Sequence, residues 1–245
     1  MARASKGNRQ AIGKMTSPQS LYKHYNKKYR IKKFKERICI MFFYMFIIRG
    51  NYMNITVYGA ASSLIDDSYK NAGKELGKKM AERGCGLVFG GGANGMMGSV
   101  AKGVDENNGY ILGVVPSFFK EANSEVSYKH CTEYIYTDTM RERKRQMEEH
   151  GEAFIITPGG IGTLDEFFEI LTLKQLGRHN KAIVIYNING FYDELDNMMT
   201  KSIEEEFITR DCKELYKVCT DLDEMLDYVM SYDPEDIDLS KVKIR

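Results

Sequence analysis

The sequence predicts an α/β protein with a Rossmann-like three-layer fold, in which helices flank a parallel sheet of about six or seven strands. From Met53 onward, short β-branched runs alternate with longer amphipathic segments, which is the pattern of βαβ units. Two of the runs lead directly into glycine-rich loops, the place where open α/β sheets bind ligands. The 245 residues, 43% of them apolar, can bury one core of good size.

The strands are expected where short apolar and β-branched runs are bounded by turn residues. They span residues 54–58, 87–89, 110–115, 134–136, 153–157, 181–186 and 215–218. The run NITVY opens the series, and the third strand ends at Pro116, which cannot donate a hydrogen bond to a ladder. The run AFIIT is apolar at nearly every position, as expected for a buried strand.

The helices are expected where apolar residues recur at helical spacing between the strands. They span residues 67–83, 97–106, 139–150, 163–176, 191–207 and 222–230. Gly84 stops the first helix, and Gly98 and Gly103 allow the second to pack closely on the sheet. Residues 117–133 are expected to be irregular, and the acidic stretch 233–238 to be loose.

Charge divides the chain into an arm and a body. Residues 1–52 contain thirteen Lys or Arg and one acidic residue, a net charge of +12, so the other 193 residues carry −11 of the total of +1. We expect a basic N-terminal arm over 1–52, a nucleotide-binding catalytic domain over 53–232 and an acidic tail over 233–245. The acidic body gives no electrostatic reason to bind nucleic acid, because Lys and Arg mainly hold phosphate backbones.

The arm contains an apolar run of eleven residues (38–48), too short for a membrane span of about 20 residues. A secretory signal fits poorly, because the basic region before the run is long and no small-residue cleavage site follows it. We expect the arm to be disordered, or the native start to be Met53. The codons for Arg49 and Gly50 can form a purine-rich stretch that would look like a ribosome-binding site just upstream of the Met53 codon. A weaker alternative is that the arm binds anionic lipid or nucleic acid.

Cysteine and histidine spacing argues against a metal centre or a redox motif. The five cysteines form no C-x-x-C or zinc-knuckle pattern, so we expect free or buried thiols in a reducing cytosol. His130, His150 and His179 are dispersed, and no H-E-x-x-H motif occurs. The sequence therefore predicts neither a metal nor a cofactor.

The first glycine-rich loop, residues 90–98 (GGGANGMMG), follows the second predicted strand. Its backbone N–H groups can approach an anion closely, and the start of the next helix adds partial positive charge. A tight turn would explain one glycine, but three in succession favour a ligand. The loop lacks the G-x-G-x-x-G pattern and a Walker lysine, so we expect a mononucleotide phosphate, contacted by Gly91 and Gly92.

The second loop, residues 158–166 (PGGIGTLDE), is the most specific feature of the sequence. Pro158 ends the strand, and Thr163 is expected to cap the helix and to offer its hydroxyl to phosphate. Glu166 would then lie in the first helical turn. A capping box with Thr163, or the helix dipole, also explains a glutamate there, and the residues alone leave both explanations open.

A basic run, MRERKR at residues 140–145, begins the helix upstream of this loop. A solvated helix face is the usual explanation of such a run. The run follows a strand, however, and should start at the same sheet edge as the glycine-rich loops. A guanidinium directed at phosphate or carboxylate is therefore the alternative.

The motif P-G-G-x-G-T-x-x-E, the R-K pair before it and the GGG loop together resemble the Lonely Guy family of cytokinin-activating phosphoribohydrolases. Members of this family were formerly labelled lysine decarboxylases. The resemblance covers about residues 53–208, and it implies that Arg143 and Glu166 are the catalytic pair. The family's G-S-S loop appears here as GAASS at 59–63, so the contribution of this loop is open.

The resemblance also implies which residues contact the substrate and its phosphate. These residues are Gly159, Gly160, Gly162, Thr163, Lys144, Glu125 and Thr172. It further implies a homodimer or larger homo-oligomer. Cysteine usage, the acidic body and the short apolar run predict a cytoplasmic protein without nucleic acid or stable membrane association.

The expected function is hydrolysis of the N-glycosidic bond of a nucleoside 5'-monophosphate carrying an N6-substituted adenine. Its oxocarbenium-like transition state needs a nearby carboxylate, here Glu166, which Arg143 would fix and keep ionised. Two alternatives stay open: a broader purine or pyrimidine nucleotide nucleosidase, and a carrier that binds a nucleotide or cofactor without cleaving it.

Overall fold

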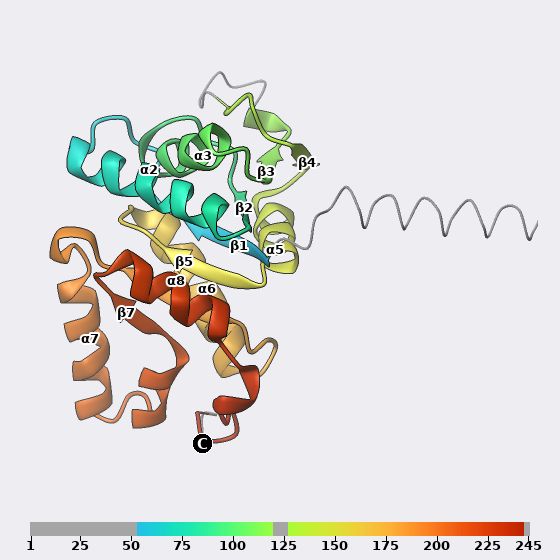
Figure 1. Cartoon of the computed structure of the whole chain (residues 1–245). Coiled ribbons are helices and arrows are strands. Elements are labelled where there is room, and N and C mark those ends of the chain that lie inside the picture. The colour runs from blue at the N-terminus through green and yellow to red at the C-terminus, as the bar shows by residue number, and fades with distance from the viewer. Residues whose placement is uncertain (1–52, 120–126, 243–245) are drawn as a thin grey trace, which may run out of the picture. The chain divides into compact units, whose positions relative to one another are not determined.

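The computed structural model describes residues 53–119 and 127–242 (Figure 1). The expectations for the arm and for Glu125 fall outside these ranges. Within them, every helix is too short or too polar to cross a membrane.

The described residues form one seven-stranded sheet with the strand order β4-β3-β2-β1-β5-β6-β7, and every neighbouring pair is parallel. The strands are β1 (Met53–Tyr58), β2 (Cys85–Phe89), β3 (Ile111–Pro116), β4 (Glu133–Thr137), β5 (Ala153–Ile156), β6 (Ala182–Tyr186) and β7 (Lys217–Cys219). The chain builds outward from β1 to β4 and then crosses back to β5, so the topology reverses between β1 and β5. Ligands of such sheets bind at that reversal, beyond the carboxyl ends of the strands.

Helices cover both faces of the sheet and confirm the expected three layers (Figure 1). The helices are α2 (Asp67–Glu82), α3 (Gly95–Glu106), α5 (Met140–His150), α6 (Ile161–Gln175), α7 (Asp193–Glu204) and α8 (Leu222–Ser231). Helices α2, α3 and α8 share one buried cluster, and α5, α6 and α7 share the other. Strand β5 contributes Ala153 and Ile155 to the first cluster and Phe154 and Ile156 to the second, which explains its continuous apolar run.

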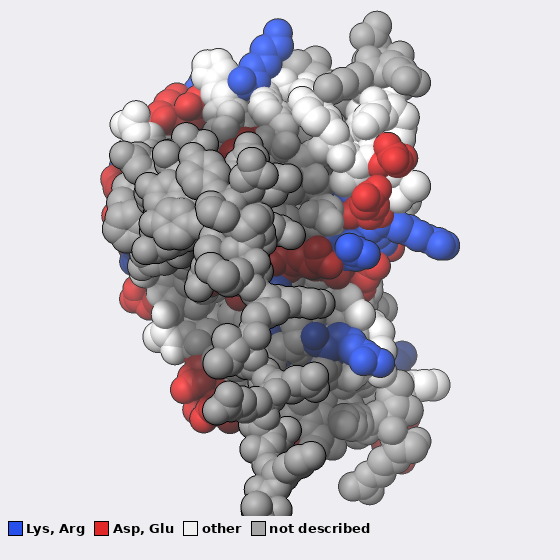
Figure 2. All heavy atoms as spheres, turned by 90° about the vertical axis from the view of Figure 1, so that its right-hand side faces the viewer, with Lys and Arg blue, Asp and Glu red and all other residues white. Residues whose placement is uncertain are grey.

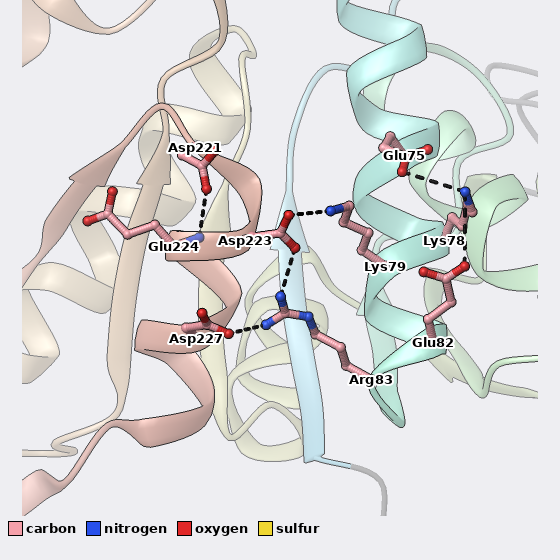
Figure 3. A network of polar contacts seen from close by, with 9 residues as sticks. All are labelled: Glu75, Lys78, Lys79, Glu82, Arg83, Asp221, Asp223, Glu224 and Asp227. Atoms are coloured by element: carbon pink, nitrogen blue, oxygen red, sulfur yellow. Dashed lines mark hydrogen bonds and ion pairs between the residues drawn. The ribbon is translucent and has the colours of Figure 1, made fainter.

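Helices α2 and α8 are joined by an ion-pair network (Figure 3). Arg83, the C-cap residue of α2, pairs with Asp223 at 2.7 Å and with Asp227, and Lys79 also pairs with Asp223. Both aspartates are at least half exposed, so the pairs add little stability individually. The network links the C-terminal end of α2 to α8.

Most boundaries differ from those predicted by one or two residues, and α6 and α7 show the differences that matter most. Helix α6 begins two residues earlier than expected, at Ile161, with Gly160 as its N-cap. Helix α7 is shorter than the predicted 191–207, because Tyr192 is a non-helical N-cap residue at its start and Glu206 has a positive φ beyond its end.

The described end of the chain, up to Val242, contacts the domain at several points. Val242 is 1% exposed, and its carbonyl accepts a hydrogen bond from Gln175 Nε2 at 3.3 Å. The Asn180 side chain donates to the carbonyls of Pro234 and Ile237. Acidic composition alone suggested a loose tail, but its few apolar side chains and its backbone carbonyls bind to the domain.

Candidate active site

A cavity of about 350 Å³ lies at the carboxyl ends of the strands, where the topology reverses. Its walls come from residues 59–62 after β1, residues 140–144 at the start of α5 and residues 160–166 at the start of α6. Met97 of α3 and Phe119, which follows β3, complete the lining. The cavity thus joins segments that are about 100 residues apart in sequence, at the sheet edge expected from the two glycine-rich loops.

Arg143 and Glu166 form a buried ion pair in the wall of this cavity. Arg143 Nη1 lies 3.0 Å from Glu166 Oε1, and the two side chains are 8% and 11% exposed. Arg143 Nε also donates to the carbonyl oxygen of Val114 in β3 at 3.2 Å. Helices α5 and α6 therefore bring together the two residues that the family resemblance paired.

Gly90, the first glycine of the GGG loop, makes room for the arginine. A Cβ atom at this position would lie 1.7 Å from Arg143 Nη2, so only glycine leaves the guanidinium in place. Gly91 and Gly92 do not line the cavity. Instead, the Gly91 carbonyl accepts the Tyr128 N–H at 2.8 Å, and Gly92 forms an isolated antiparallel bridge with Ser127. The first loop thus packs against Arg143 at Gly90, and phosphate contact by Gly91 and Gly92 stays a prediction.

The start of α6 forms another part of the cavity wall. Gly160 is the N-cap and makes no side-chain capping bond, so Thr163 is the third helical residue and not the expected cap. Glu166 consequently lies in the second turn, where a capping box with Thr163 cannot explain it. Gly159 is needed beside this helix, because a Cβ there would lie 2.2 Å from Thr163 Oγ1. Gly160, Gly162 and Thr163 all line the cavity.

Burial changes the acidity of Glu166. Removal from water raises its pKa to about 7, although the charge and hydrogen bond of Arg143 act in the opposite direction. We expected Arg143 to keep this carboxylate ionised, but the effect of burial is larger. Near neutral pH the Glu166 carboxyl is therefore present in both protonation forms, which suits proton transfer.

Lys144 joins α5 to α6 at the cavity wall. Its Nζ lies 3.0 Å from Asp165 Oδ2 and 2.5 Å from Glu169 Oε2. Burial alone would lower the pKa of Lys144, but these two carboxylates outweigh burial and raise it. The ammonium therefore reaches the cavity as a charged group that is already paired. Thr172, also expected at the substrate, is exposed on α6 and does not line the cavity.

Sequence reasoning missed the apolar part of the lining, which consists of Met97, Phe119 and Met140. The sequence analysis gave none of these three residues a role in the site. Their positions could have indicated the site, because Met97 and Met140 lie near the starts of helices that follow strands, where the ligand-binding edge of the sheet is expected. The loop at 59–62, whose contribution was open, lines the cavity and donates the Ala60 N–H to the Pro158 carbonyl at 3.1 Å.

Other kinds of site find little support in the described part of the chain. No group of three or more His, Cys, Asp or Glu residues there is arranged to hold a metal ion. The four described cysteines are free thiols. On the face shown in Figure 2, the described basic side chains are interspersed with acidic ones and form no continuous basic patch.

This fold and cavity define a Rossmann-like α/β protein with a buried acid–arginine pair at its ligand-binding edge. A family model described as "Possible lysine decarboxylase" matches residues 97–229, more than half of the chain. The chain belongs to the Lonely Guy family of cytokinin riboside 5'-monophosphate phosphoribohydrolases.

Relatives from two plants support this assignment. A probable cytokinin riboside 5'-monophosphate phosphoribohydrolase of Oryza sativa subsp. japonica is 36% identical over 178 residues, 73% of this chain and 76% of the relative. A cytokinin riboside 5'-monophosphate phosphoribohydrolase of Arabidopsis thaliana is 31% identical over 187 residues, 76% of this chain and 87% of the relative.

Solved structures share the fold at lower identity. The molybdenum cofactor carrier protein of Chlamydomonas reinhardtii aligns with a TM-score of 0.57 and 22% identity, covering 74% of this chain and 96% of that one. The molybdenum cofactor binding protein of Rippkaea orientalis aligns with a TM-score of 0.56 and 17% identity, covering 74% and 98%. At these identities the likeness establishes the Rossmann-like architecture alone.

Proposed function

We propose that this protein hydrolyses the N-glycosidic bond of a nucleoside 5'-monophosphate with an N6-substituted adenine, releasing the free base and ribose 5-phosphate. The observation that carries the proposal is the buried Arg143–Glu166 pair, 3.0 Å apart in the wall of a cavity at the start of α6. Membership of a phosphoribohydrolase family supports it, because the paired residues are those that the family motif contains.

The 5'-phosphate would bind at the start of α6. The first backbone N–H groups of a helix have no intrahelical acceptor and, with the helix dipole, favour an anion. Gly160 and Gly162 leave this backbone accessible from the cavity, and Thr163 adds a hydroxyl. Lys144 supplies positive charge on the other side by exchanging a carboxylate partner for the phosphate.

Cleavage would then take place beside Glu166. As the bond from C1' to the base nitrogen breaks, its electron pair leaves with the base, and positive charge spreads over C1' and the ring oxygen. The ionised Glu166 carboxylate stabilises that charge and accepts a proton from the attacking water, whose oxygen bonds to C1'. Arg143 holds the carboxylate in position. The base leaves with a proton taken up from solvent or from the site.

The apolar wall supports a base with an apolar substituent. Met97, Phe119 and Met140 line the cavity together and can contact a ring system and a short hydrocarbon group. Two strongly exposed apolar residues, Leu64 at 93% and Ile161 at 89%, adjoin the segments that form the cavity wall. Their exposure supports the further proposal that the protein works as a homodimer or larger assembly.

Base release is the direct test of the proposal. The protein is incubated with AMP and with an N6-substituted AMP, and the free base is quantified by chromatography. Wild type should release base, preferentially from the N6-substituted nucleotide, and Glu166→Gln should lower kcat by about 10³-fold or more while still binding nucleotide. Glu149→Gln, an exposed change on α5, is the matched control and should retain wild-type activity.

The outcomes separate the alternatives. Equal release from several purine and pyrimidine nucleotides would indicate the broader nucleosidase. Nucleotide binding without release by wild type would indicate a carrier. A Glu166→Gln enzyme that hydrolyses at the wild-type rate would show that the catalytic assignment is wrong.

A further inference from the structure

The turn between β5 and α6, residues 157–160, carries the phosphate side of the cavity and is tied to its surroundings at several points. The Thr157 N–H and Oγ1 both donate to the Tyr58 carbonyl, at 2.9 and 2.8 Å. The Pro158 carbonyl accepts the Ala60 N–H at 3.1 Å. These bonds join the turn to β1 and to the loop after it.

A further contact comes from Tyr192, which lies just before α7 and outside every motif of the sequence. Its hydroxyl donates to the Thr157 carbonyl at 2.8 Å. The side chain is 2% exposed, so water cannot readily replace this bond. One phenol oxygen therefore holds the residue that precedes Pro158.

Tyr192 is itself held in place from the opposite side. Its N–H donates to Asn187 Oδ1 at 2.7 Å, and Asn187 Nδ2 donates to Asp193 Oδ1 at 2.6 Å. The Asn187 N–H bonds to the Cys219 carbonyl at the end of β7. Through these hydrogen bonds Tyr192 connects the turn to the ends of β6 and β7. None of them involves Arg143 or Glu166.

We infer that Tyr192 is a positioning residue for the substrate phosphate, because it fixes the turn from which α6 begins. The inference rests on the proposed function. Loss of the hydroxyl would free the Thr157 carbonyl and loosen the turn before α6. Arg143 would stay bonded to Val114 and Glu166. Phosphate binding should therefore suffer more than the chemical step.

The test is the split between KM and kcat in Tyr192→Phe. We expect KM for a nucleoside monophosphate to rise about tenfold, equivalent to about 1.4 kcal/mol, while kcat changes less than about threefold. Tyr216→Phe is the matched control. Tyr216 is 4% exposed and packs on Phe167 of α6, but its hydroxyl bonds to Asp196 and makes no contact with the turn. It should leave KM unchanged.

Titration with ribose 5-phosphate separates this inference from the proposed function. If wild type releases no base, the proposed function fails, while a tenfold weaker Kd for ribose 5-phosphate in Tyr192→Phe still supports the role of Tyr192. KM and Kd within about twofold of wild type would overturn it, as would an equal KM increase in Tyr216→Phe. If Tyr192→Phe does not fold, Asn187→Ser, which releases the backbone of Tyr192, is judged by the same criteria.

Discussion

Replacing Gly90 by alanine tests the packing on which the site depends. The new Cβ would lie 1.7 Å from Arg143 Nη2 and 2.9 Å from Cζ, whereas carbon contacts are stable at about 3.5 to 4.0 Å. The guanidinium must therefore move by roughly 2 Å. Such a shift breaks its 3.0 Å bond to Glu166 and its 3.2 Å bond to the Val114 carbonyl.

The structure sets the size of the effect. Glu166, which is 11% exposed, would lose its cationic partner, and breaking a buried pair from one side costs about 3 to 5 kcal/mol. Because the end of an arginine side chain is flexible, we expect the lower value, about 3 kcal/mol, for the loss in free energy of unfolding. Base release should fall with it, as far as in Arg143→Ala.

A double-mutant cycle provides the assay. Urea denaturation and base release are measured for wild type, Gly90→Ala, Arg143→Ala and the double variant. Since Arg143→Ala removes the atoms that the new methyl group would strike, Gly90→Ala should have almost no further effect in that background. If the two substitutions are additive to within about 0.5 kcal/mol, the glycine does not accommodate the arginine and the reasoning is refuted.

Two further predictions concern pH and the chain end. Because burial raises the Glu166 pKa to about 7, and its ionised form is the proposed base, kcat/KM should rise with pH through about 7; a flat pH–rate profile from pH 5.5 to 8.5 would contradict this. Truncation after Lys241 removes Val242, which is 1% exposed, and should lower the free energy of unfolding by about 2 kcal/mol; an unchanged urea midpoint would show that the packed end contributes nothing.

The fold was largely predictable because the spacing of apolar residues along the sequence indicates which side chains are buried. Alternating runs predicted all seven strands in order, and the all-apolar run of β5 predicted a strand covered on both faces. Boundaries were predicted less well where backbone conformation decides them. The start of α6 at Ile161 depends on Gly160 serving as N-cap without a side-chain bond, although Thr163 looked the better capping residue.

The pairing of Arg143 with Glu166 was predictable only through the family motif, because 23 positions separate the two residues. Their burial was not predictable, since a helix with four basic residues in five positions usually faces solvent. Tyr192 had no signal at all. Its importance comes from a hydrogen bond to a residue 35 positions away, formed only when β5 and β6 pair.

The two glycine-rich loops looked alike in sequence, yet their surroundings differ. The first makes room at Gly90 for the guanidinium of Arg143, and the second opens the start of α6 to the cavity. Added side chains should therefore have different effects: at Gly90 they displace the Arg143 guanidinium, and in the second loop they obstruct the proposed phosphate position. If phosphate bound mainly to the first loop, Gly90→Ala would raise the Kd for ribose 5-phosphate as strongly as it lowers kcat. The geometry predicts a loss of kcat with that Kd almost unchanged, because residues 160–163 keep their contacts.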